Sequence, residues 1–144
     1  MVVRHEVLRE RIAGLRVACS RLAELRIRAG MDPATEWARE RGLQIAAQAV
    51  FDIGNHVLAG GFAERPADYA SITAMLARKG VISDELEARL RGLAGFRNLL
   101  VHDYARVDSA KVLEMLETRL QDFLAFADVV EDWLNRNLGT TEHR

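Results

Sequence analysis

The sequence is poor in cysteine and proline, and it lacks any long apolar run. Cys19 is the only cysteine among 144 residues, so the chain cannot form an internal disulfide or a thiolate metal cluster. With two prolines and 49% hydrophobic residues, it can build a packed helical core, and disorder is not expected. No apolar segment is long enough to span a bilayer, and residues 1–6 lack the apolar core of a signal peptide. We therefore expect a cytoplasmic protein without membrane segments.

The charged residues are balanced, and the positive ones are almost all arginine. The formal net charge is −1, which argues against broad electrostatic capture of nucleic acid but leaves room for a small local RNA site. Arginine suits bidentate phosphate contacts better than lysine, although such a bias can also be purely compositional. The four histidines show no metal-ligand spacing, so we expect neither a metal nor a cofactor. They are His5, His56, His102 and His143.

Apolar residues recur at three- and four-residue spacing along the chain, and no strand pattern is present. At this length the chain is expected to form a single domain, residues 1–144. The pattern predicts five helices, at 3–29, 33–59, 69–78, 83–104 and 109–137. Expected N-caps are Asp32, Asp68, Ser83 and Asp108. Expected helix ends are Gly30, the Gly60 and Gly61 pair, and Gly139. We therefore predict an all-α antiparallel bundle with short connections.

The second predicted helix is apolar on more than one side, which indicates a central position in the bundle. Its apolar residues include Trp37 near its start. Gly54 lies inside this helix at a cost of roughly 1 kcal/mol against alanine, and close approach of another helix is the expected reason. Asp52 is a polar group on this otherwise apolar element, and it is a candidate ion-pair partner for Arg97.

An arginine interrupts the apolar stripe of the predicted helix 83–104. The stripe consists of Leu86, Leu90, Leu93, Arg97, Leu100 and Tyr104. Burying an unpaired guanidinium is costly, so Arg97 should meet a carboxylate, another chain or a phosphate. On an ideal helix Tyr104 projects within about 20° of Arg97, whereas His102 projects about 140° away. Either the helix loosens near His102, or two copies of the chain pool their side chains across a cleft.

An arginine and a histidine suffice for cleavage of RNA without a metal. The histidine can remove the proton of a 2′-hydroxyl, whose oxygen then attacks the adjacent phosphorus. The arginine stabilises the charge that develops on the phosphoryl oxygens. DNA lacks this hydroxyl and would not be cleaved. Asn98 lies four residues before His102 and can help to orient its imidazole. The structural alternative is that Arg97 forms a salt bridge and that His102 interacts with the helix dipole.

The residues of this motif resemble those of a known family. Residues 95–104 read Gly-Phe-Arg-Asn-Leu-Leu-Val-His-Asp-Tyr, which is similar to the Arg-x4-His-x-Tyr signature of the HepT toxins, a branch of the HEPN superfamily. Residues 40–46, 52–56, 66–69 and 80–82 resemble other parts of that family in the same order. The resemblance implies a ribonuclease toxin in which Arg97 and His102 are catalytic. It also implies that Tyr104 is modified with AMP by a partner, the small nucleotidyltransferase antitoxin MntA, which silences the toxin.

The expected function is therefore that of a metal-independent endoribonuclease toxin with a HEPN-like fold. Two motif helices would face each other in a homodimer and form one composite cleft for RNA. The alternative is a non-catalytic helical module that binds a nucleotide or a nucleotidyltransferase, in which Arg97 only holds phosphate.

Overall fold

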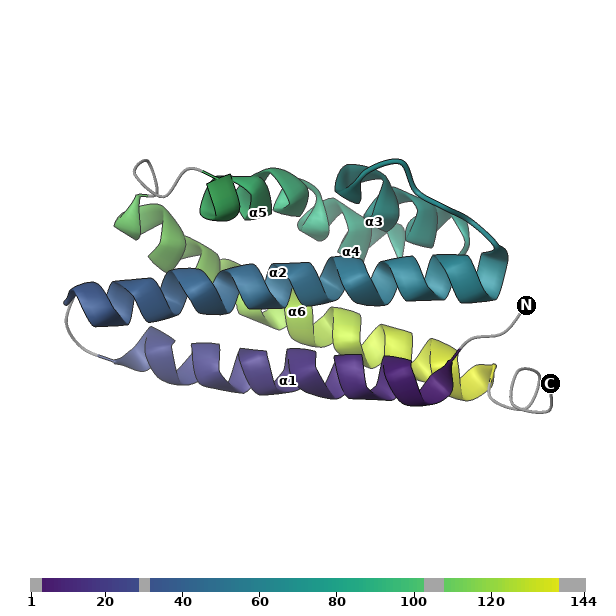
Figure 1. Cartoon of the computed structure of the whole chain (residues 1–144), viewed down its shortest axis with the longest axis horizontal. Helices are drawn as coiled ribbons and strands as arrows, with labels where there is room; N and C mark the ends of the chain where they lie inside the picture. Colours follow the sequence, from purple (N-terminus) through teal and green to yellow (C-terminus); the bar gives the residue numbers. More distant parts are fainter. Residues whose placement is uncertain (1–3, 29–31, 103–107, 138–144) are drawn as a thin grey trace.

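The computed structural model describes residues 4–28, 32–102 and 108–137, apart from the side chain of His102. These ranges contain six helices and no strand (Figure 1). The helices are α1 (His5–Ile27), α2 (Pro33–Phe62), α3 (Tyr69–Arg78), α4 (Asp84–Leu90), α5 (Leu93–His102) and α6 (Ser109–Arg136). The predicted all-α bundle is confirmed.

The three long helices α1, α2 and α6 pack against one another, and the short helices α3, α4 and α5 cover them on one side (Figure 1). The α1 helix runs antiparallel to both α2 and α6. After α2 the chain turns back, so that α5 runs antiparallel along α2 and ends over its first half. No helix in the described part of the chain is long and apolar enough to cross a membrane.

Side-chain caps begin the helices as the sequence predicts. Asp32 accepts a hydrogen bond from the Thr35 N–H at 2.8 Å, directly before Pro33, the first residue of α2. The other three predicted caps, Asp68, Ser83 and Asp108, each accept a backbone N–H at the start of α3, α4 and α6. The predicted ends at Gly30 and Gly139 lie outside the described residues.

The second helix does not end at Gly60 and Gly61, which corrects the prediction. It continues to Phe62, whose ring lies 6.0 Å from that of Trp133 on α6. This packing extends the helix past two residues of low helix propensity. The helix ends instead at Ala63, which adopts a left-handed conformation with φ 54° and donates its N–H to the carbonyl oxygen of Leu58.

The predicted helix 83–104 is also divided in two, which is a second correction. It breaks between α4 and α5 at Arg91 and Gly92, where Gly92 has a φ of +91°. Leu90 and Leu93 on the two sides of the break are both buried. The leucine spacing therefore predicts correctly which residues are buried, although these residues belong to two helices rather than one.

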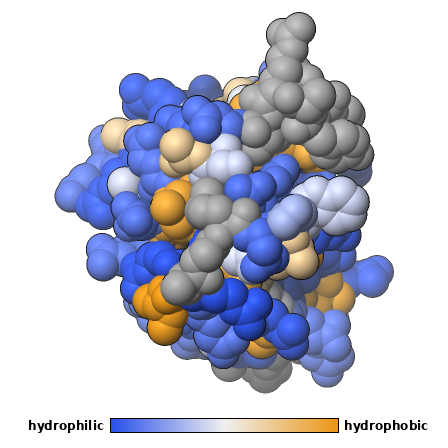
Figure 2. All heavy atoms as spheres, turned by 90° about the vertical axis from the view of Figure 1, so that its left-hand side faces the viewer, coloured by the Kyte–Doolittle hydropathy of each residue, from blue (hydrophilic) through white to orange (hydrophobic). Residues whose placement is uncertain are grey.

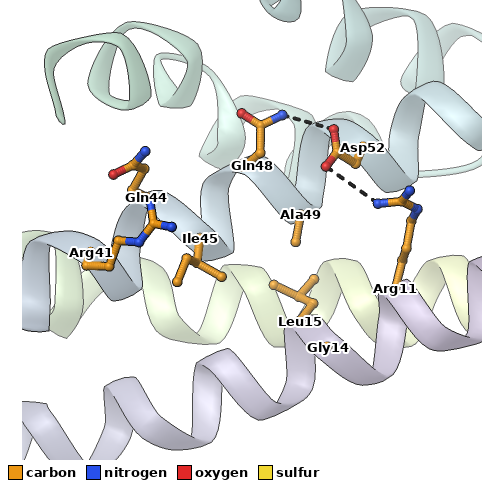
Figure 3. Close-up of a pocket in the computed structure, with 9 residues that line it drawn as sticks. All are labelled: Arg11, Gly14, Leu15, Arg41, Gln44, Ile45, Gln48, Ala49 and Asp52. Carbon is orange, nitrogen blue, oxygen red and sulfur yellow. Dashed lines mark hydrogen bonds and ion pairs between the residues drawn. The ribbon is translucent and has the colours of Figure 1, made fainter. Parts of the chain in front are cut away.

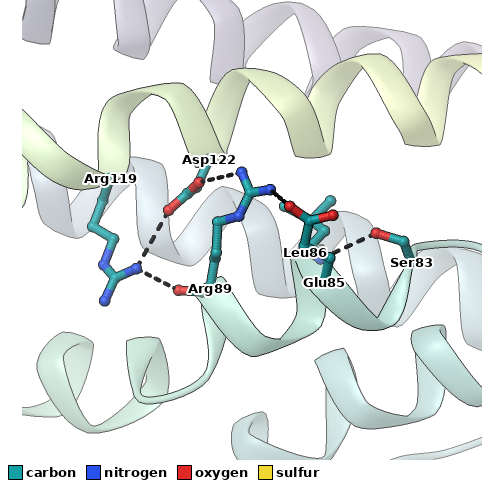
Figure 4. Close-up of polar contacts among 6 residues, drawn as sticks. All are labelled: Ser83, Glu85, Leu86, Arg89, Arg119 and Asp122. Carbon is teal, nitrogen blue, oxygen red and sulfur yellow. Dashed lines mark hydrogen bonds and ion pairs between the residues drawn. The ribbon is translucent and has the colours of Figure 1, made fainter.

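A buried carboxylate ties α4 to α6 beside this break (Figure 4). Asp122 is 4% exposed and lies between Arg89 of α4, at 3.6 Å, and Arg119 of α6, at 3.4 Å. Arg119 also donates to the backbone carbonyl of Arg89 at 2.7 Å, and Arg89 forms an ion pair with Glu85. These contacts compensate the desolvated carboxylate and fix the end of α4, from which α5 departs.

Trp37 is not part of the core, contrary to the prediction. It is 76% exposed near the start of α2. Its side chain lines a hollow beside Leu100 of α5 instead of packing into the core. Figure 2 views this end of the molecule and shows a largely hydrophilic surface with separate hydrophobic spots.

Gly54 lies where α3 packs closely against α2, as expected from the sequence. A Cβ atom at this position would lie 2.5 Å from Cγ2 of Ile72 and 3.1 Å from Cδ1 of Leu76. Both side chains are buried, and the Ile72 methyl group is attached directly to its Cβ, so it cannot move aside freely. The glycine thus allows α3 to pack directly against the α2 backbone.

We expect Gly54→Ala to lower the free energy of unfolding by about 1–2 kcal/mol, because steric overlap outweighs the gain in helix propensity. The matched control is Gly14→Ala in α1, where a Cβ would meet nothing within 4 Å. This control should raise the free energy of unfolding by about 0.5–1 kcal/mol. Urea unfolding followed by circular dichroism measures both changes. A Gly54→Ala protein as stable as the Gly14→Ala protein would contradict the close approach of α3.

Candidate functional site

Arg97 is half-buried on α5, facing α2 and α3. Its Nε donates a hydrogen bond to Oε1 of Gln48 on α2 at 2.9 Å. Its guanidinium carbon lies 4.9 Å from the centre of the Tyr69 ring on α3. Its Nη1 makes a longer contact, 3.3 Å, with Oδ1 of Asn98. No ion pair joins Arg97 to a carboxylate within the described part of the chain, so its positive charge is not neutralised there.

The expected ion pair between Arg97 and Asp52 is absent, which corrects the prediction. Asp52 lies one turn after Gln48 on α2, where it accepts a hydrogen bond from Nε2 of Gln48 at 2.9 Å. Its other oxygen lies 3.7 Å from Nη1 of Arg11 on α1. The amide of Gln48 therefore stands between the carboxylate and Arg97. The result is a polar chain of Arg11, Asp52, Gln48 and Arg97 that crosses α2.

A pocket of about 340 Å³ lies between α1 and α2 beside this polar chain (Figure 3). Arg11 and Asp52 lie at one end of it and Arg41 and Gln44 at the other. A second hollow, of about 580 Å³, lies between the first half of α2 and Leu100 of α5. Arg41 and Gln44 line both hollows, so the two adjoin along α2.

Two residues of this arrangement are not singled out by the sequence analysis. Tyr69 looks like a packing residue in the sequence, and it does stack on Phe51, with ring centres 4.9 Å apart and planes at 11°. The same ring also lies against the guanidinium of Arg97. Gln48 is one of three polar residues spaced four apart on α2, Gln44, Gln48 and Asp52. This polar stripe is the signal that could have found it.

The structure describes only part of the predicted motif. Helix α5 is continuous from Arg97 to His102, its last residue. The side chain of His102 is not among the described parts of the structure. Tyr104 lies among the undescribed residues 103–107. Asn98 is exposed and contacts Arg97, while its suggested contact with His102 stays a prediction.

The pKa values of His56 and Cys19 are shifted by their surroundings. Burial lowers the pKa of His56, one turn after Asp52 on α2, and the nearby Arg11 lowers it further while Asp52 opposes the shift. This shift favours the uncharged imidazole. Burial raises the pKa of the Cys19 thiol to about 11, so this side chain remains protonated and behaves as a small core residue. Within the described ranges, no three His, Cys, Asp or Glu side chains gather as metal ligands would.

Comparison with known proteins identifies relatives along most of the chain. Residues 10–130 match the family model described as ribonuclease HepT-like. The chain is 30% identical over 89 residues to the mRNA nuclease HepT of Shewanella oneidensis, covering 62% of this chain and 67% of that protein. It is 28% identical over 97 residues to the tRNA nuclease HepT of Aphanizomenon flos-aquae, covering 66% and 65%.

Solved structures show the same fold at lower sequence identity. YutE of Bacillus subtilis, a cytosolic protein of unknown function, superposes with a TM-score of 0.85 at 19% identity over 96% of both chains. A tri-AMPylated HEPN toxin of Shewanella oneidensis, in complex with an MNT antitoxin, superposes with a TM-score of 0.80 at 24% identity, covering 88% of this chain and 97% of that one. Since the family match extends from α1 well into α6 and includes the motif of Arg97 and His102, the chain belongs to the ribonuclease HepT-like family.

Proposed function

We propose that this protein is a metal-independent endoribonuclease toxin that acts as a homodimer and is silenced by AMP modification of Tyr104. The observation that carries the proposal is the state of Arg97. Among the described residues its guanidinium is held by an amide oxygen and an aromatic ring rather than by a carboxylate, and this leaves its charge available for a phosphate group. The mRNA and tRNA nucleases among the relatives support RNA, rather than DNA, as the substrate.

In the proposed reaction His102 acts as the general base and Arg97 stabilises the transition state. The imidazole takes the proton of a 2′-hydroxyl, and the 2′-oxygen attacks the adjacent phosphorus. The bond from phosphorus to the 5′-oxygen breaks, and this oxygen takes up a proton as it leaves. Arg97 binds the phosphoryl oxygens, on which negative charge accumulates. The products are a 2′,3′-cyclic phosphate and a 5′-hydroxyl, and every step proceeds without a metal ion.

We expect the unmodified protein, purified without an antitoxin, to cleave RNA in EDTA. Arg97→Ala and His102→Ala should each slow cleavage by about 10²–10⁴-fold, because each removes one part of the proton transfer or the charge stabilisation. An RNA with a single 2′-deoxy position at the cleavage site should resist cleavage there. Gel analysis of end-labelled RNA measures all three effects.

The outcomes of this experiment separate the candidate functions. Cleavage that survives both substitutions would point to a contaminating nuclease, and loss of activity in EDTA would contradict metal independence. A wild-type protein that binds phosphate without cleaving RNA would favour the non-catalytic module.

A homodimer would explain how Arg97 and His102 act on the same phosphate although they lie on different faces of α5. Helix α5 does not unwind between Arg97 and His102, so these positions lie about 140° apart around one helix axis. One α5 helix therefore carries the two residues on different faces, whereas a twofold axis would bring Arg97 of one copy close to His102 of the other. The exposed Trp37 lines the hollow beside Leu100 on this side of the molecule, and the second copy would cover both.

Mixing two inactive variants tests this arrangement. If Arg97 of one copy acts with His102 of the other, a heterodimer of Arg97→Ala and His102→Ala chains contains one intact site. After denaturation and refolding together, an equal mixture should recover about a quarter of wild-type activity, because half of the dimers are mixed and each has one of two sites. Each variant refolded alone should stay inactive. A mixture that also stays inactive, with dimers confirmed by sedimentation, would place both groups in one subunit.

The AMP modification of Tyr104 is what the resemblance to HepT toxins implies for this chain. Tyr104 is seven residues after Arg97 in the sequence. Transfer of AMP from ATP would join the phenolic oxygen to the α-phosphorus and release pyrophosphate. The new phosphate would then compete with RNA for the charge of Arg97. The solved Shewanella complex contains an AMPylated toxin and its antitoxin, which supports this form of regulation.

Co-expression with an MntA-type nucleotidyltransferase should add the mass of one or more AMP groups to the chain and abolish cleavage of RNA. Tyr104→Phe should lose this adduct and retain toxicity, because it lacks the phenolic oxygen. Tyr69→Phe is the matched control, since it removes the other tyrosine hydroxyl and should leave the adduct in place. Intact mass spectrometry measures the adduct. A full adduct on the Tyr104→Phe protein would exclude this site.

A further inference from the structure

We propose that Gln48 and Tyr69 are positioning residues that hold the guanidinium of Arg97 in the orientation needed to bind an RNA phosphate. This inference rests on the proposed ribonuclease function. It assigns a role in that site to two residues, from α2 and α3, that lie outside the motif carried by α5.

Gln48 fixes Arg97 through the direction of its own amide. Its Nε2 donates to Oδ1 of Asp52 at 2.9 Å, and this contact leaves Oε1 facing Nε of Arg97, also at 2.9 Å. A flipped amide would lose both hydrogen bonds, because it would point its NH₂ group at the guanidinium and its oxygen at the carboxylate. Asp52 is in turn held near Arg11. The carboxylate therefore selects one orientation of Gln48, and Gln48 selects one orientation of Arg97.

Tyr69 supports the face of the same guanidinium. Its ring centre lies 4.9 Å from the guanidinium carbon, a distance at which a cation interacts favourably with an aromatic face. The ring is itself fixed by stacking on Phe51, which is 1% exposed. The contact from Gln48 Nε2 to the Tyr69 hydroxyl, at 3.4 Å, is long, so the ring rather than the hydroxyl should matter.

These two contacts leave one edge of Arg97 for a ligand. The Nε is occupied by Gln48, and within the described part of the chain Nη1 makes the 3.3 Å contact with exposed Asn98. Nη1 and Nη2 together form the edge that binds two oxygens of a phosphate. Both supports are uncharged, whereas a carboxylate at position 48 would neutralise Arg97 and compete with phosphate. A glutamine at this position orients the cation and preserves its charge.

The first arm of the test observes Arg97 directly and does not depend on activity. In a ¹H–¹⁵N spectrum of the full chain, the Nε–H signal of Arg97 is identified by its disappearance in Arg97→Lys. Gln48→Met removes the acceptor at similar side-chain length and should shift this signal toward that of solvent-exposed arginines. Gln121→Met, on the exposed surface of α6, makes the same chemical change and should leave the signal in place. An unchanged Arg97 signal in Gln48→Met would overturn the positioning role.

The second arm measures RNA cleavage and separates orientation from charge. Gln48→Met should lower kcat by tens of fold, because a misplaced guanidinium stabilises the transition state poorly. Gln48→Glu keeps an acceptor and should mainly raise KM, because the added carboxylate competes with the substrate phosphate. In an Arg97→Ala background, neither Gln48→Met nor Gln48→Glu should change kcat or KM further, because both substitutions act through Arg97. Additive losses in that background would show that Gln48 does not act through Arg97 and would contradict the positioning role.

Tyr69 is tested with a matched pair of substitutions. Tyr69→Phe keeps the ring and should cleave RNA within about twofold of the wild type, whereas Tyr69→Leu should be slower by about 3- to 30-fold. Equal losses in both variants would assign the effect to the hydroxyl and contradict the stacking role. If the wild type cleaves no RNA while the Arg97 signal still responds to Gln48→Met, the proposed function fails although the contact exists.

Discussion

The hydrogen bond between Gln48 and Arg97 is the contact on which the candidate site depends. A guanidinium in a helical bundle normally requires a carboxylate, because an unpaired charge in an apolar environment is costly. Arg97 avoids this cost by remaining half-buried and by using an amide oxygen and an aromatic ring as partners. These partners stabilise the cation without neutralising it. Such a site is suited to a substrate that carries negative charge and differs from a purely structural ion pair.

The contrast with Asp122 in the same molecule illustrates the difference. Asp122 is buried and lies between two arginines, both of which it partly neutralises. This cluster holds α4 against α6, and no charge is left over for a ligand. At Arg97 the nearest carboxylate in the polar chain, Asp52, is separated from the guanidinium by Gln48 and pairs with Arg11 instead. The Asp122 cluster stabilises the packing of α4 on α6, whereas the contacts of Arg97 leave its positive charge available for a ligand.

Helix α2 connects the fold to the site. Its buried face packs on α1, α3 and α6, and Gly54 allows α3 to approach closely enough for Tyr69 at its start to stack on Phe51. The polar stripe of the same helix provides Gln48 and Asp52. The orientation of Arg97 on α5 thus depends on the packing of α2 against α3. Both the core and the site require α2 to remain straight and continuous through Gly54.

The sequence by itself determined the helical class, the four N-caps, the close approach at Gly54 and the motif that contains Arg97 and His102. Each of these depends on local chemistry or on periodicity, which one chain segment carries alone. Only the tertiary structure decided the break at Gly92, the extension of α2 to Phe62, the exposure of Trp37 and the partners of Arg97. These features depend on contacts between segments far apart in the chain. Gln48 and Arg97 are 49 residues apart, and no local pattern specifies that an amide rather than Asp52 meets the guanidinium.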